Sequence, residues 1–432
     1  MSELPSNPQG LITRWLAKAP MWVFTLYAGA MAFGAYFAMY AYRKPFSAAS
    51  YGTVPGWDFV LDFKIALVIA QVFGYALSKI IGVKVISELP AHQRALAILV
   101  LIGLAELALL GFALTPAPWN VAFLFLNGLP LGLIWGLVFG FIEGRRVSEV
   151  VGAILCASFI VSSGVVKSVG KWVMLQGWAN EVWMPVLTGL LFVPLLLLTV
   201  WGLAQLPPPS AADEAARVKR APMDGKARAA LFLRFAPGLL ALIGVYVLLT
   251  AFRDFRDNFA AEIWTELGYG DAAEIFTFSE IPVAIVVLVA LAFLARFKDN
   301  GRALLANMAF VAVGAAILGG ATFAWQAGLI NPVAWMILLG AGLYLAYTPF
   351  NGLLFDRLIA ATGTVGTAGF LIYVADASGY VGAVALMLVK NFVDLNLDWV
   401  AFLSWAAYGT SAVGLVFTLI AGGYFAARIK RN

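Results

Sequence analysis

The stretch "LPPPSAADEAARVKRAPMDGKARA" (Leu206–Ala229) is the longest polar interruption in an otherwise apolar chain of 432 residues, and it lies near the midpoint. Its Pro, Ala and charged residues are typical of a linker. The whole chain is 62% hydrophobic and only 12% charged, against roughly 25% charged residues in soluble domains. The stretch therefore divides an integral membrane protein into two halves.

Apolar runs long enough to cross a bilayer as helices, about 18 residues or more, lie on both sides of this linker. Six runs precede it and six follow it, with approximate limits 20–44, 62–86, 93–115, 119–143, 147–173, 183–205, 236–260, 273–296, 302–325, 332–356, 362–390 and 398–427. We predict an all-α integral membrane fold of twelve transmembrane helices. Its domains are a six-helix half over 1–205, a cytoplasmic linker over 206–232 that could hold a short surface helix, and a six-helix half over 233–432.

The distribution of Lys and Arg predicts the orientation, because cytoplasmic loops carry an excess of these residues. With the N-terminus inside, most cations fall in the even-numbered turns and both tails, whereas an opposite loop such as "NFAAEIWTELGYGDAAE" (258–274) is acidic. We expect a multi-pass plasma (inner) membrane protein with both termini cytoplasmic. The pI of about 9.2 then reflects topology and not a nucleic-acid partner. The first apolar run is too long for a signal peptide and is expected to stay.

The chain has one cysteine, Cys156 in an apolar run, and one histidine, His92 in the loop "ELPAHQRA". An intrachain disulfide is therefore excluded, and a histidine metal centre or a catalytic triad is not expected. No "GxxxxGK[ST]" loop is present. We expect no enzymatic activity, no metal and no cofactor.

Two short internal matches support duplication. "YRKPFSA" (42–48) is similar to "FRDNFAA" (255–261), and "GFIEGRR" (140–146) is similar to "GLLFDRL" (352–358), each at the end of a corresponding helix. Two parallel six-helix halves are the pattern of major facilitator transporters, which bind substrate between the halves near the membrane midplane. Glycines in "NGLPLGLIWGLVFG" (127–140) would let helices approach closely.

Cations inside apolar helices are costly and usually face a cavity or a charged partner. If helix one continues past Pro45, Arg43 and Lys44 lie below the surface, and at most one faces a cavity. We assign Arg43 to the cavity and treat Lys44 as snorkelling towards the surface. The repeat makes Arg256 the counterpart of Arg43. The predicted binding residues are Arg43, Lys79, Arg256, Arg253, Tyr42 and Tyr373.

Other charged residues have different expected roles. Lys64, Lys167, Lys171 and Lys390 are interpreted as anchors to lipid headgroups. Asp376, in the middle of helix eleven, could pair with a binding-site arginine, carry a coupling proton or be a structural partner, and Glu106 and Glu280 are alternatives. The candidates for cytoplasmic gating or structural salt bridges are Glu143, Arg145, Asp356 and Arg357.

Three segments resemble the organophosphate:phosphate antiporters of the major facilitator superfamily. These are "YAYRKPF" (40–46), "GYALSKIIG" (74–82) and "GTAGFLIYVADASGYVGA" (366–383). In that family a helix-one arginine and its helix-seven counterpart grip the phosphoryl group, and a helix-two lysine supports them. The resemblance implies these roles for Arg43, for Arg256 or Arg253, and for Lys79. The family's helix-five histidine has no match in "CASFIVSSG" (156–164), and Asp376 is an additional acid.

The hypothesis is a monomeric secondary transporter that moves a small anion, an organic phosphate or carboxylate, by rocking its halves in the lipid bilayer. Phosphate or a proton would be the coupling ion. One alternative is a proton-coupled exporter of amphipathic drugs or lipids, which predicts that the cations point outward to the surface. A less favoured alternative is a non-transporting membrane sensor.

Overall fold

The computed structural model describes residues 10–143, 145, 147–210, 213, 225–351, 353–363, 368–393 and 397–429. Much of the expected linker, 211–212 and 214–224, lies outside the described residues, as do Arg146 and Gly352 of the second internal match. The limits of the two halves and of the linker therefore stay predictions.

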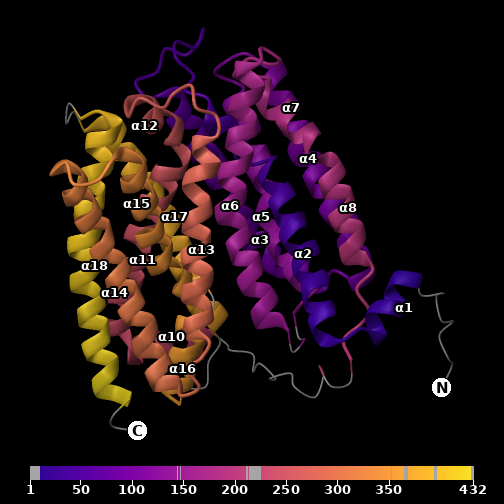
Figure 1. Cartoon of the computed structure of the whole chain (residues 1–432), viewed down its shortest axis with the longest axis vertical. Helices are drawn as coiled ribbons and strands as arrows, with labels where there is room; N and C mark the ends of the chain where they lie inside the picture. Colours follow the sequence, from indigo (N-terminus) through magenta and orange to yellow (C-terminus); the bar gives the residue numbers. More distant parts are fainter. Residues whose placement is uncertain are drawn as a thin grey trace.

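The described chain is helical, and its helices gather into two bundles (Figure 1). The first contains α2 (Met21–Tyr40), α3 (Phe63–Glu88), α4 (Arg94–Leu114), α5 (Val121–Gly140), α6 (Ser148–Leu175), α7 (Met184–Leu191) and α8 (Val193–Ala204). The second contains α11 (Ala236–Asn258), α12 (Ala260–Glu266), α13 (Ile275–Leu294), α14 (Asn300–Gln326), α15 (Pro332–Tyr347), α16 (Leu354–Ala361), α17 (Ala368–Phe392) and α18 (Trp399–Ile429). The short helices α1 (Leu11–Lys18) and α10 (Gly225–Arg234) precede the two bundles.

The described residues contain up to twelve candidate membrane spans. Eleven helices are long and apolar enough to cross a membrane, and the bent pair α7 and α8, which meet at 45°, makes the twelfth. Pro194 lies in the first turn of α8. Its missing N–H cannot bond the carbonyl of Leu190, which explains the break between the two helices. The prediction of a multi-pass membrane protein with twelve transmembrane helices is confirmed.

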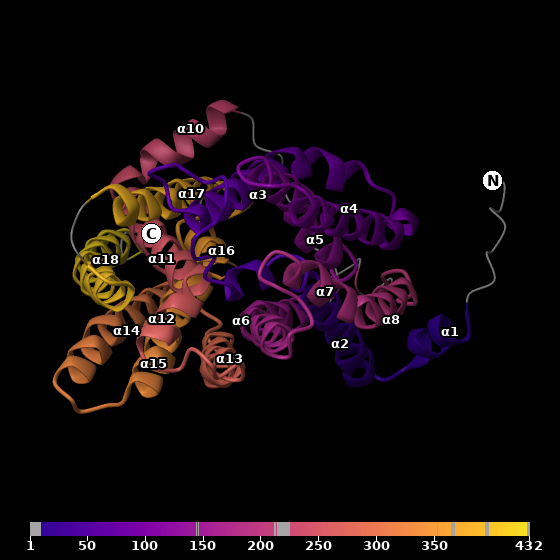
Figure 2. The same ribbon diagram turned by 90° about the horizontal axis from the view of Figure 1, so that it is seen from above.

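The two bundles repeat one packing scheme, so they are related by pseudo-symmetry. In the first bundle α2 packs on α6 and α8, and α3 packs on α5. In the second, α11 packs on α17 and α18, and α13 packs on α15. Between the bundles α6 contacts α13 and α3 contacts α17, which Figure 2 shows as two seams on opposite sides of the interface. The predicted pair of pseudo-symmetric six-helix halves is confirmed.

Helix α1 and the last turns of α18 lie at the same end of the molecule, which we call the terminal end; the opposite end is the far end (Figure 1). Helices α3 and α13 both begin at the far end. Depth can therefore be read from a residue's position along these helices, because an α-helix rises about 1.5 Å per residue.

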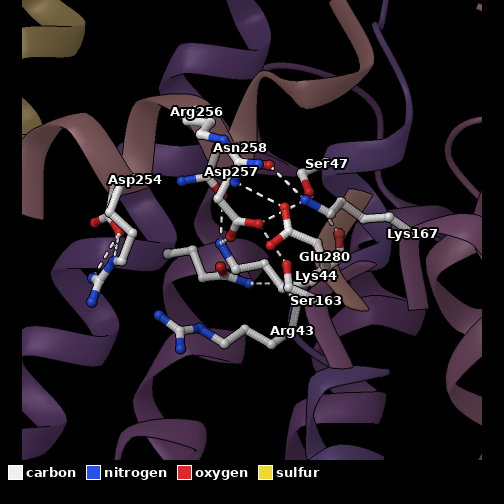
Figure 3. Close-up of polar contacts among 12 residues, drawn as sticks. Arg43, Lys44, Ser47, Ser163, Lys167, Asp254, Arg256, Asp257, Asn258 and Glu280 are labelled. Atoms are coloured by element: carbon white, nitrogen blue, oxygen red, sulfur yellow. Dashed lines mark hydrogen bonds and ion pairs between the residues drawn. The ribbon is translucent and has the colours of Figure 1, made fainter. Parts of the chain in front are cut away.

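Helix one ends earlier than predicted. It stops at Tyr40, and a turn over 41–43 leads into a 3₁₀ helix, Pro45–Ala48. Proline has no N–H, and in a helix its ring clashes with the carbonyl of the residue four positions earlier, so an α-helix cannot run smoothly through Pro45. The expectation of a continuous helix through Lys44 was wrong. Arg43 and Lys44 therefore lie at the turn and point in different directions (Figure 3).

Candidate functional site at the interface between the halves

Arg43 lies deep in the molecule and not at its surface. Its carbonyl accepts a hydrogen bond of 2.9 Å from Gln71 Nε2. Its guanidinium carbon is 4.0 Å from the ring centre of Tyr75 and 5.7 Å from that of Tyr40. Gln71 and Tyr75 lie near the middle of α3. The exporter hypothesis predicts that this arginine points outward to the surface. The structure does not show that arrangement.

The Arg43 guanidinium has no acidic partner among the residues that the structure describes. Within the described ranges it makes no hydrogen bond or ion pair, and its Nε is buried without an acceptor. The residue as a whole is only half-buried. In Figure 3 its side chain extends away from the neighbouring cluster of ion pairs. A cation at this depth with no internal counter-charge is what an anion-binding site requires.

Lys79 and Asp376 form an ion pair of 2.5 Å that joins α3 of the first half to α17 of the second. The side chains are 29% and 16% exposed, so solvent reaches the pair. Asp376 also accepts a hydrogen bond of 2.5 Å from Tyr246 on α11. The Tyr373 hydroxyl donates to the carbonyl of Lys79 at 2.8 Å. This predicted binding lysine and this predicted coupling acid are therefore in direct contact.

Arg253 joins the same network from the second half. Its guanidinium pairs with Asp254 at 2.8 Å, donates to the Tyr347 hydroxyl, and lies 4.5 Å from the ring centre of Tyr347. The hydroxyls of Tyr347 and Tyr246 are 3.0 Å apart. A chain of polar contacts thus runs from Arg253 through the two tyrosines to the Asp376 and Lys79 pair.

Arg256, the counterpart of Arg43 in the repeat, has a different environment. It is 3% exposed, pairs with Glu280 at 2.8 Å and donates to the carbonyl of Met336 at 3.0 Å. Glu280 is five residues from the start of α13, and Met336 is near the start of α15, so Arg256 lies towards the far end. Of the two candidate arginines on α11, Arg253 is the one that joins the tyrosine network.

A cluster of buried ion pairs lies between the halves next to Arg43 (Figure 3). Asp257 on α11 pairs with Lys44 at 2.5 Å and with Lys167 on α6 at 2.6 Å, and it accepts a hydrogen bond from Ser163. Lys44 also donates to Asn258 at 2.8 Å. Lys44 is 5% exposed and Lys167 is 2% exposed. Interpreting Lys167 as a headgroup anchor and Lys44 as snorkelling was therefore wrong.

Lys64 and Glu262 form a second pair across the halves at 2.7 Å. Lys64 is 1% exposed and also donates to the carbonyl of Ser47, so it does not reach headgroups and its predicted anchoring role was also wrong. Burial raises the pKa of the Glu262 carboxyl above its ordinary value, and the Lys64 ammonium opposes that rise. Because both residues lie at the far end, the pair holds the halves together there.

A signal for these contacts is present in the sequence. Asp257 lies within the second copy of the repeat and Glu262 directly follows it, and the buried lysines lie in otherwise apolar segments of the first half. Complementary charges in apolar surroundings indicate pairing, because a buried charge needs a partner. Which acid meets which lysine depends on the packing of helices distant in sequence.

The chain belongs to DUF5690, a family of unknown function. The match covers residues 45–428. No curated protein matches the chain.

Several solved structures are similar in fold. The xylose transporter XylE from E. coli, in a partially occluded inward-open conformation, matches with a TM-score of 0.61 and 14% identity, over 93% of this chain and 98% of that chain. The nucleoside transporter NupG gives 0.58 and 16%, over 93% and 99%. A bacterial homologue of the human drug peptide transporters PepT1 and PepT2 gives 0.62 and 16%, over 94% and 98%. These matches establish the major facilitator fold for this chain.

Tyr42 and Glu106 lie inside the first half and not between the halves. Both carboxylate oxygens of Glu106 are buried without a hydrogen-bond partner among the described residues, and so is the Tyr42 hydroxyl. A Cβ on Gly189 of α7 would lie 2.4 Å from Glu106 Oε2, so only glycine leaves room for this carboxyl group. Their assignments to binding and coupling stay predictions.

The residues proposed for a cytoplasmic gate lie at the terminal end. Arg145 donates to the carbonyls of Phe141 and Pro207, at 3.1 and 2.6 Å, and Arg357 donates to Asn300 at 2.8 Å. None of these contacts joins the two halves: Arg145 contacts its own half and the start of the linker, and Arg357 contacts its own half. Glu143 and Asp356 also make contacts, and the gating role of all four residues stays a prediction.

Proposed function

We propose that this protein is a secondary active transporter that moves a small anionic metabolite across the membrane by alternating access. The observation that carries the proposal is the guanidinium of Arg43, which lies at the middle depth of α3 without a counter-charge among the described residues. A guanidinium donates two parallel hydrogen bonds to adjacent oxygens, so a carboxylate or an organic phosphate suits it. The protein is proposed to act without enzymatic chemistry.

The proposed binding site draws on both halves. Arg43 and Lys79 come from the first half, and Arg253 and Tyr373 come from the second. Arg253 replaces Arg256 as the preferred second arginine, because Arg253 contacts the tyrosines that lead to Asp376, whereas Arg256 is buried towards the far end. A ligand that bridges the halves would couple its binding to their rocking motion.

The pattern of contacts supports alternating access. Lys44, Lys64 and Lys167 each pair with an acid of the opposite half. The pairs Lys44–Asp257 and Lys64–Glu262 lie at the far end, where α11 ends and α3 begins. Opening that end requires these pairs to separate. Solved proteins of the same fold include a D-xylose-proton symporter and a nucleoside transporter, which makes solute transport the first function to test here. We propose that the chain acts as a monomer in the inner membrane with both termini cytoplasmic.

The proposal is tested by uptake into proteoliposomes. A panel of labelled carboxylates, organic phosphates and inorganic phosphate is offered to the wild-type protein, to Arg43→Gln, and to Arg296→Gln, which removes an exposed cation away from the interface. We expect uptake of at least one anion, reduced at least about 100-fold by Arg43→Gln, because losing a charge-assisted contact costs roughly 1.5–3 kcal/mol and orientation is lost as well. Arg296→Gln should transport normally.

Other outcomes lead to other functions. Extrusion of amphipathic dyes without anion uptake would favour a drug or lipid exporter. Anion binding without flux would favour a sensor. Full anion uptake by Arg43→Gln would remove Arg43 from the site.

A further inference from the structure

We propose that Asp376 is an internal anion that competes with the substrate for Lys79, so that a proton and the anionic substrate bind together. This inference rests on the proposed function and assigns its coupling step. The present arrangement is then the substrate-free one, in which the carboxylate of Asp376 takes the place of the substrate's anionic group beside Lys79.

Arg43 and Lys79, the two cations proposed to bind the anion, both lie next to Tyr75 of α3. The Arg43 guanidinium carbon lies 4.0 Å from the ring centre of Tyr75, and the Lys79 ammonium lies 5.6 Å from the same ring centre. The two cations therefore border one aromatic ring. An anion with two or three oxygens seated beside Tyr75 could accept hydrogen bonds from both, provided that Lys79 is released from Asp376.

The two cations differ in whether an acid neutralises their charge. The Lys79 ammonium is neutralised by Asp376 at 2.5 Å, whereas the Arg43 guanidinium is not neutralised by any described acid. A substrate that binds now would receive only the charge of Arg43. When Asp376 accepts a proton from solvent, its carboxylate becomes a neutral carboxyl group and Lys79 is free to bind the substrate. The positive charge available to an anion then rises from one to two.

The groups that face Asp376 come from three packed elements. Lys79 and Tyr75 lie on α3, Tyr246 and Arg253 on α11, and Tyr347 on α15, while Tyr373 and Tyr380 share α17 with Asp376. Arg253 already pairs with Asp254, so among these groups Lys79 is the cation whose charge depends directly on Asp376. Tyr246 can keep a hydrogen bond to Asp376 in both protonation states, because a hydroxyl both donates and accepts.

The linkage has a fixed sign. A bound anion removes Lys79 from Asp376 and so strengthens proton binding to Asp376, and by reciprocity a bound proton strengthens anion binding by the same factor. Lower pH should therefore tighten anion binding. Proton and anion would cross the membrane in the same direction, as in a symporter.

The test uses sulfate, a probe whose charge does not change over the pH range used. Sulfate affinity of the purified full-length protein is measured by thermal shift and calorimetry at about pH 5.5 and about pH 8, against sodium chloride of matched ionic strength. In the wild type we expect sulfate to bind about 10- to 100-fold more tightly at the lower pH. This factor corresponds to the free energy that one charge-assisted hydrogen bond contributes to binding. Asp376→Asn should bind tightly at both pH values. The control Asp271→Asn, at an exposed loop acid, should behave like the wild type.

The main result of a second measurement is obtained on the wild-type protein alone. Addition of sulfate to weakly buffered wild-type protein should cause uptake of up to one proton per sulfate bound, detected with an indicator dye, and Lys79→Gln should abolish this uptake. Equal sulfate affinity of wild type and Asp376→Asn at both pH values, absence of sulfate binding by either, or binding without proton uptake would each overturn the proposal. These outcomes differ from failure of the proposed function, which is the lack of uptake of every anion in the panel.

Discussion

Three side chains of the first half converge on Asp257 of the second half. Its two carboxylate oxygens are each used by a buried lysine, Lys44 on one side and Lys167 on the other, and Ser163 adds a hydrogen bond. Two ammonium groups share a single carboxylate. Desolvating charges is costly, and removing one member of such a group leaves the others buried without compensation.

At this scale we predict that Asp257→Asn lowers the free energy of unfolding by about 3–5 kcal/mol, the usual cost of breaking a buried ion pair by removing one partner. Thermal unfolding in detergent measures the change. Asp271→Asn removes a surface acid of the same half and should leave the melting temperature unchanged. Equal melting temperatures for the two variants would mean that the cluster contributes nothing to stability.

Close packing of α3 on α5 positions the helix that carries Gln71, Tyr75 and Lys79. A Cβ on Gly74 would lie 2.1 Å from the carbonyl oxygen of Phe125, and one on Gly128 would lie 2.3 Å from that of Gln71. These obstacles are backbone atoms, which cannot rotate away. The expectation that glycines of 127–140 permit close helix contacts is confirmed at Gly128.

We therefore predict that Gly74→Ala forces α3 away from α5. Overpacking costs typically about 1–3 kcal/mol, and the shift should also displace Tyr75 and weaken anion binding. The matched control is Gly103→Ala on α4, where an added Cβ meets nothing within 4 Å and should be neutral or slightly stabilising. Melting temperature and sulfate affinity of both variants are the measurements. Equal behaviour of the two would contradict the packing argument.

The whole molecule is described in a state whose halves are joined by ion pairs at the far end and by the Lys79 and Asp376 pair deeper inside. Ser168 on α6 and Thr277 on α13 also meet across the interface, with their hydroxyl oxygens 2.7 Å apart. In a transporter that alternates, α6 and α13 must separate during each cycle. A covalent link between them should therefore stop the cycle.

We predict that Ser168→Cys with Thr277→Cys, in a Cys156→Ser background, loses anion uptake on mild oxidation and regains it on reduction. Each single-cysteine variant serves as a control and should keep its uptake under oxidation. Undiminished uptake by the oxidised, cross-linked double variant would show that this seam does not open during transport.

The sequence by itself determined the class and the architecture of this protein. Twelve apolar runs divided by one polar stretch are a direct consequence of the thickness of a bilayer, and the repeat around Arg43 predicted two related halves. The sequence also predicted that Arg43 lies deep in the molecule and that Lys79 and Asp376 are candidates for a functional role. The reason is that a charge inside an apolar run is costly wherever it lies.

Only the tertiary structure decided which charges neutralise each other. Lys44, Lys64 and Lys167 could be taken for surface anchors because their acids lie about one to two hundred residues further along the chain. The repeat suggested Arg256, but its position next to Glu280 was set by the packing of both α11 and α13 on α15. Pairing depends on distances of a few ångströms between helices, whereas a single sequence specifies each helix without its neighbours. For that reason the uncompensated charge of Arg43 became visible only when the two halves were assembled.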